Sequence, residues 1–243
     1  MHRKKKFGER KTGREFPREP GQWPEPVDTP HQLQQILRYC HEPETREKAL
    51  KRLEGMAEIL DEDVSMELLR LSQNRKAVEI AIGKISRADP LIHRFRNNQN
   101  AIGQWNSQAH YWGEDEESAR MISELGEVNR AIIRRLGSLV EKDSWAEAAR
   151  AVYMVIDYSD EAGDISKALG RLLMLGEEEP LQALDIISAK TESVIAAVEK
   201  VRSWDAFEGM AALSRLDNLV AQSPDVRLGR IVSYLNENRP SLD

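Results

Sequence analysis

Apolar residues recur at steps of three and four along most of the chain from residue 30 onward. Residues 164–175 show the pattern clearly, with Ile165, Ala168, Leu169, Leu172 and Leu173 at helical spacing. This period predicts amphipathic α-helices. Alternating runs rich in Val, Ile and Thr are lacking, as are Asn-Gly and Asp-Gly hairpin turns. The sequence therefore predicts an all-α protein, either an α-solenoid-like antiparallel array or an irregular multi-helix bundle.

The interruptions between these segments are short, which favours antiparallel neighbouring helices. We expect an N-terminal helical unit over residues 30–105, an aromatic and polar joint over 106–113, and a C-terminal helical array over 114–243. Residues 1–29 are rich in proline and poor in aliphatic side chains, so they cannot bury enough apolar surface to fold. We expect them to form a disordered basic arm.

Two segments share a motif. "PETREKALKRL" at 43–53 and "PDVRLGRIVSYL" at 224–235 each begin with proline and an acid, and each has arginine three residues after the proline. Over 43–60 and 224–235 the chain resembles HEAT-type helices, which stack in pairs into curved solenoids. The resemblance implies a binding scaffold with a concave surface and no catalytic residue. A non-repetitive bundle is the alternative.

Composition indicates a protein of a reducing compartment. The single cysteine, Cys40, cannot form an internal disulfide bond. The positively charged N-terminus is not followed by an apolar stretch, and no run of about 18 apolar residues occurs. We expect no membrane segment and a cytoplasmic location, or a nuclear one in a eukaryote.

Known catalytic motifs are missing from the sequence. It has no glycine-rich phosphate loop, no H-E-x-x-H and no G-x-S-x-G. Cys40 and His41, with His31 nearby, are donors of the kind that bind zinc, but adjacent helical residues point about 100° apart and no second cluster supplies further ligands. We expect a buried Cys40, an exposed His41, no metal, no cofactor and no catalytic residue.

Positive charge is concentrated near the N-terminal half. The net charge of the chain is -6, yet residues 70–100 hold seven Lys and Arg against two acids. Lys76, Lys84 and Arg87 share one side of a helix predicted over 74–87. A basic face of this kind can contact phosphates or an acidic partner; a solvated face is the alternative. The candidate contacts are Arg3, Lys4, Lys5, Lys6, Arg70, Arg75, Lys76, Lys84, Arg87, Arg94 and Arg96.

Aromatic residues gather in one stretch. Four of the 14 aromatic residues fall within 95–112, among amides and arginines. Such mixtures are typical of interface hot spots and of surfaces that stack nucleic-acid bases. The alternative is that Trp105 and Trp112 fill the corner between two helical units. The candidate partner-binding residues are Phe95, Trp105, His110, Tyr111 and Trp112.

A long helix predicted over 114–141 has a second unusual feature. A coiled-coil seam with one polar member is formed by residues at steps of three and four: Ile122, Leu125, Asn129, Ile132, Leu136 and Leu139. The seam favours either a homodimer through residues 122–139 or a long central helix packed within its own domain.

Together these features predict a non-catalytic helical scaffold or adaptor that binds another macromolecule, a protein in the first instance. The alternative is a nucleic-acid-associated protein that uses the basic arm and the face of residues 70–96. An enzyme of unrecognised type is the third hypothesis.

Overall fold

The computed structural model describes residues 29–112, 115–141, 145–222 and 226–238. These residues form helices and no strand, which confirms the all-α prediction. The basic arm predicted over 1–29 lies outside the described residues, apart from Thr29. The helices are α1 (Pro30–Tyr39), α2 (Pro43–Gly55), η2 (Ala57–Ile59), α3 (Glu62–Leu71), α4 (Arg75–Lys84), α5 (Ala88–Trp112), α6 (Glu116–Leu139), α7 (Trp145–Tyr158), α8 (Ala162–Glu178), α9 (Pro180–Ala189), α10 (Thr191–Trp204), α11 (Ala206–Ala221), η3 (Val226–Leu228) and α12 (Gly229–Asn238).

Short polar side chains begin several of these helices. Asp61 accepts a hydrogen bond from the backbone N–H of Val64, and Asn74 accepts one from that of Ala77. Asp115 does the same for Ser118 at the start of α6. Each bond satisfies one of the N–H groups that a helix leaves unpaired in its first turn. These local signals explain why short connections suffice between the helices.

The first half of the chain is a stack of antiparallel helical hairpins. Helix α1 packs on α2, α3 on α4, and α5 on α6. Neighbouring hairpins then meet through α1, α3 and α5 on one side, and through η2, α4 and α6 on the other. In this half, consecutive hairpins therefore pack side by side along the row of helices.

Basic side chains join successive hairpins by donating to the carboxyl ends of helices. Lys84 Nζ lies 2.6 Å from the carbonyl of Glu58 and 2.7 Å from that of Leu60. Arg94 Nη2 lies 3.0 Å from the carbonyl of Ser72, and Arg135 Nε lies 2.9 Å from that of Ile85. A helix leaves its last carbonyls unpaired and slightly negative, so a cation is favourable there.

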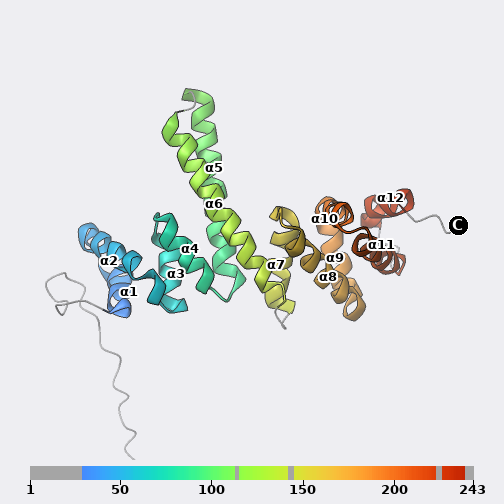
Figure 1. The fold of residues 1–243 in the computed structure, drawn as a ribbon, viewed down its shortest axis with the longest axis horizontal. Coiled ribbons are helices and arrows are strands. Elements are labelled where there is room, and N and C mark those ends of the chain that lie inside the picture. The colour runs from blue at the N-terminus through green and yellow to red at the C-terminus, as the bar shows by residue number, and fades with distance from the viewer. Residues whose placement is uncertain (1–28, 113–114, 142–144, 223–225, 239–243) are drawn as a thin grey trace, which may run out of the picture.

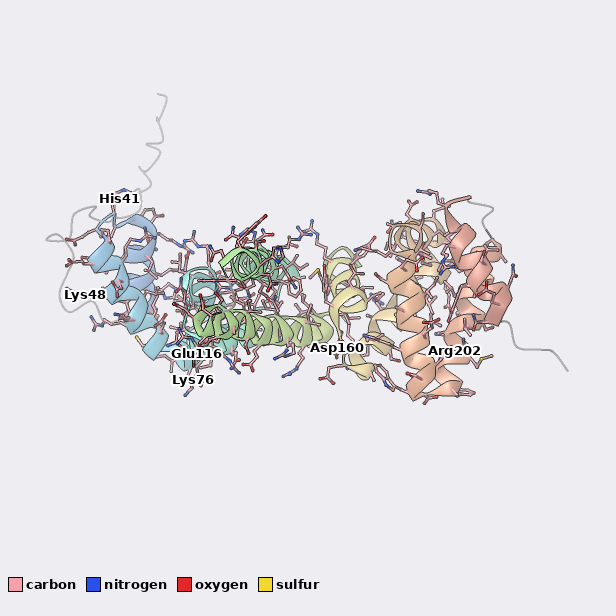
Figure 2. The ribbon with its side chains drawn as sticks, turned by 90° about the horizontal axis from the view of Figure 1, so that it is seen from above. His41, Lys48, Lys76, Glu116, Asp160 and Arg202 are labelled. Carbon is pink, nitrogen blue, oxygen red and sulfur yellow. The ribbon has the colours of Figure 1, made fainter. Side chains whose placement is uncertain are left out.

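The second half of the chain is a bundle around α8. Helices α7, α9, α10 and α11 all pack against α8, and α12 closes the end against α10 and α11. Figure 1 shows the row of helices from α1 and α2 at one end to α11 and α12 at the other. In Figure 2, Lys48 lies near the first end and Arg202 near the second.

Two hydrophobic cores run through this row. The smaller one is built from α1 to α4, and the larger one from α3 to α12. Helix α4 serves both, since Ala77 and Ala81 face the smaller core while Val78 and Ile82 face the larger one. The α3–α4 hairpin is therefore a shared wall, so the stack and the bundle are continuous.

One predicted interruption is wrong. The polar stretch from residue 106 onward was expected to end a helix, but α5 continues through it to Trp112. The reason is geometric, because α5 here packs against α6 alone and needs only a narrow apolar stripe. Ile102, Trp105 and Ala109 supply that stripe at helical spacing. Residues 113 and 114, at the turn, lie outside the described residues.

Candidate functional site

The α5–α6 hairpin extends beyond the body of the molecule. Figure 1 shows it standing away from the row of helices. On α5 the last residue of the large core is Phe95, and on α6 the first is Val128. We call residues 99–112 and 115–126 the outer hairpin. In the described structure no third helix covers the outer hairpin. The apolar side chains of its two helices therefore pack only against one another.

A buried polar contact marks where the outer hairpin begins. Asn98 Nδ2 donates to Asn129 Oδ1 at 2.9 Å, and both side chains are buried. An amide pair between apolar layers favours one register of two helices over others. Asn129, the polar member of the predicted seam, therefore packs against α5 of its own chain. The seam residues Ile132, Leu136 and Leu139 are likewise buried in the large core.

The apolar residues of the outer hairpin are incompletely buried. Ile102, Trp105 and Ala109 on α5 are half-buried, as are Ile122 and Leu125 on α6. Two amphipathic helices cannot fully cover each other's apolar stripes, which normally face a third element. The outer hairpin therefore presents an apolar surface that is only partly buried.

The candidate aromatic residues separate into buried and exposed members. Tyr111 is 79% exposed, and its ring meets that of His110 edge-on at a centroid distance of 5.5 Å. Trp105 is half-buried. Phe95 is buried against Tyr158, with ring centroids 4.8 Å apart. Its prediction as a partner contact is therefore wrong, because it belongs to the base of the hairpin.

Trp112 is the last residue of α5, and its side chain lies outside the described structure. The other two candidates at the tip, His110 and Tyr111, are both exposed. Trp105, His110 and Tyr111 thus all lie on the outer hairpin, and the rings of His110 and Tyr111 are in contact.

The two helices of the outer hairpin differ in charge. From residue 90 to 113 the sequence has no acid, and its polar residues are mostly amides. Helix α6 is instead capped by Asp115 and begins with Glu116 and Glu117, and all three acids are exposed. Glu116 is labelled in Figure 2. A partner laid along the hairpin would meet a neutral, hydrogen-bonding helix and an acidic helix side by side.

Seven of the candidate basic residues lie in the described part of the chain, and four of these donate to oxygen atoms of the protein. Lys84 and Arg94 donate to backbone carbonyls, and burial lowers the pKa of the Arg94 guanidinium. Arg70 forms an ion pair with Glu67 at 2.7 Å. Arg75 forms ion pairs with Glu79 and Glu127. Arg75, Lys84 and Arg94 thereby connect separate segments of the chain. The Arg70–Glu67 pair lies within α3.

The remaining basic candidates lie on separate segments. Lys76 is exposed on α4, at the outer edge of the molecule in Figure 2. Arg87 lies between α4 and α5, with Nη2 3.1 Å from Met66 Sδ, and Arg96 is exposed on α5. Residues 3–6 of the arm lie outside the described residues. Among the described residues, the candidate basic side chains therefore do not form one basic face.

A second exposed aromatic pair was missed by the sequence analysis. Phe207 is 84% exposed and Trp204 is about half exposed, at the junction of α10 and α11. Trp204 follows Val201 by three residues and so continues the apolar stripe of α10. This spacing is that of a buried residue, so the sequence pattern did not indicate that Trp204 is exposed. Two aromatics within the four residues "WDAF" were the available signal.

Cys40 is buried and His41 is exposed, as predicted. Within the described ranges, no group of three or more His, Cys, Asp or Glu residues is arranged to hold a metal ion. None of the helices described is both long and apolar enough to cross a bilayer.

No protein-family model, curated protein or solved structure matches the chain. The resemblance of residues 43–60 and 224–235 to HEAT-type helices stays a prediction.

Proposed function

We propose that this protein is a non-catalytic helical scaffold that binds another protein through the outer hairpin. The observation that carries the proposal is the position of the exposed Tyr111 and half-buried Trp105 on a hairpin that lies beyond both cores. A partially exposed apolar stripe rimmed by polar groups is typical of an interaction surface. The rest of the molecule provides a continuous support that holds this surface at a fixed position.

The partner surface that fits best is an amphipathic helix. A third helix laid against Ile102, Trp105 and Ile122 would complete a three-helix arrangement, in which each apolar stripe meets two others. The amides of α5 would supply hydrogen bonds at the rim.

The experiment is photo-crosslinking in the cells of origin, with the crosslinking amino acid at position 111 of the full chain. Position 207 is the matched control, because Tyr111 and Phe207 are both highly exposed aromatic residues. The protein that is captured at 111 is then purified and its affinity measured for the wild-type chain, Tyr111→Ser and Phe207→Ser.

We expect Tyr111→Ser to weaken binding about tenfold or more, the size of a hot-spot loss, and Phe207→Ser to leave it unchanged. Equal capture at both positions, or equal affinity of both variants, would count against the outer hairpin. Capture of nucleic acid at 111, with affinity that falls steeply as salt rises, would favour the nucleic-acid alternative instead.

A further inference from the structure

A polar groove of about 520 Å³ lies at the base of the hairpin, between α5 and α7. Small-molecule sites commonly enclose roughly 300–1,000 Å³, so the groove is large enough for a small ligand. It is separate from the outer hairpin, and its residues come from α5, α7 and the junction of α9 and α10.

Helix α5 lines the groove with one face of its first two turns. Asp89, Ile92, His93 and Arg96 are spaced by three, one and three residues, which places them on one side of the helix. Ile92 is buried and the other three are exposed. This face therefore gives an apolar floor below polar side chains.

Helix α7 repeats this spacing. Arg150, Tyr153, Met154 and Asp157 line the opposite wall, with Met154 buried in the large core. The two helices lie side by side and run in the same direction. Asp89, near the start of α5, pairs with Arg150 in the middle of α7, and the Phe95 and Tyr158 rings meet farther along both helices. By this register Arg96 and Asp157, each seven residues beyond the first pair, lie at the same end of the groove.

Charges at that end are not balanced. Lys190 Nζ forms an ion pair with Asp157 Oδ2 at 2.5 Å, and the Asp89–Arg150 pair neutralises the other end. Arg96 has no hydrogen-bond or ion-pair partner among the described residues. The groove thus carries one excess positive charge, on a guanidinium whose planar donors suit an oxyanion.

One acceptor in the same region also lacks a partner. Asp157 Oδ1 is buried and receives no hydrogen bond within the described structure. An unpaired buried acceptor is unfavourable, and a donor from a ligand would satisfy it. The ligand that fits is an oxyanion that also carries an O–H group, which an ionised carboxylate or sulfate does not.

We propose that this groove binds a phosphate group, with phosphate oxygens accepting from Arg96 and an O–H of the ligand donating to Asp157 Oδ1. Free hydrogenphosphate meets both requirements in one ion. A small phosphorylated molecule meets them through its phosphate and a hydroxyl group.

The test is an NMR titration of the full chain, labelled with ¹⁵N, at a mildly alkaline pH where phosphate and sulfate are both mainly dianions. Inorganic phosphate is expected to shift amide signals within 89–96, 150–157 and 190. Sulfate is expected to bind about tenfold more weakly than phosphate. It has no O–H group to donate to Asp157, and its negative charge is repelled by the Asp157 carboxylate. Ribose 5-phosphate distinguishes free phosphate from a phosphorylated molecule as the ligand. If it binds more tightly than inorganic phosphate, the ligand is a phosphorylated molecule; if the two bind equally, the ligand is the free ion.

Variants make the assignment specific. Arg96→Gln is expected to weaken phosphate binding about tenfold or more, whereas Lys76→Gln, an exposed cation outside the groove, is expected to have no effect. Asp157→Asn is expected to bring the affinities for phosphate and sulfate together, with folding checked by circular dichroism. Equal wild-type affinities for the two ions, shifts only outside the groove, or unchanged binding by Arg96→Gln would overturn the proposal.

Discussion

Glu67 shows how one side chain joins two hairpins of the stack. It is buried on α3, where its carboxylate accepts from Arg38 of α1 at 2.6 Å and from Arg70 at 2.7 Å. Burial alone would raise the pKa of Glu67, but the hydrogen bonds and charges of the two arginines outweigh it and lower the pKa. Because the folded-state pKa is depressed, the ionised form stabilises the fold above the unfolded-state pKa. That contribution is lost as the pH falls through the folded-state pKa.

We therefore expect Glu67→Gln to lower the free energy of unfolding by about 1.5–3 kcal/mol at neutral pH, the range for hydrogen bonds to charged groups. Urea denaturation at pH 7 and again near pH 3 measures the loss, which should shrink at the acidic pH as the wild-type carboxylate becomes protonated. Glu47→Gln is the control, because the Glu47–Lys51 pair is exposed on α2 and should give no resolvable change. A loss of the same size at both pH values would contradict the assignment.

Among the helices, α10 and α11 approach so closely that only glycine fits between them. A Cβ placed on Gly209 would lie 2.6 Å from Cα of Arg202, which is backbone and cannot rotate away. Gly209→Ala should therefore force the helices apart and lower the free energy of unfolding by about 1–3 kcal/mol.

The matched control is Gly170→Ala on α8, because an added Cβ there meets no atom within 4 Å. This change should be neutral or should stabilise by about 0.5–1 kcal/mol through helix propensity. Thermal unfolding of both variants measures the difference. Equal stability of the two variants would show that the α10–α11 contact is looser than described.

The helices themselves were largely predictable from the sequence, and the exceptions have physical causes. The stripe of Ile165, Ala168, Leu169, Leu172 and Leu173 predicted α8 because every member faces the large core. The end of α5 was mispredicted because amides outnumber apolar residues from 97 onward. A hairpin that packs on one neighbour tolerates such a composition, whereas a helix inside a bundle does not.

The sequence pattern did not predict which helices of the whole molecule pack against one another. Arg96 was recognised as a basic candidate, but its neighbours Arg150, Asp157 and Lys190 belong to segments that no spacing rule relates. Likewise, the charge of residues 70–96 predicted a binding face, while the fold uses Lys84 and Arg94 to satisfy helix ends. Periodicity reports which side of a helix is apolar, and only the packing determines what that side meets.

We infer that the outer hairpin is the surface that holds a partner protein. Hydrogen–deuterium exchange of the full chain, with and without the purified partner captured at position 111, shows which helices the partner covers. We expect the free chain to exchange quickly in residues 99–112 and 115–126, since few buried contacts protect these amides. The partner should slow exchange in those two segments and leave α8 to α11 unchanged. Protection confined to other helices, with the outer hairpin exchanging as before, would contradict the claim.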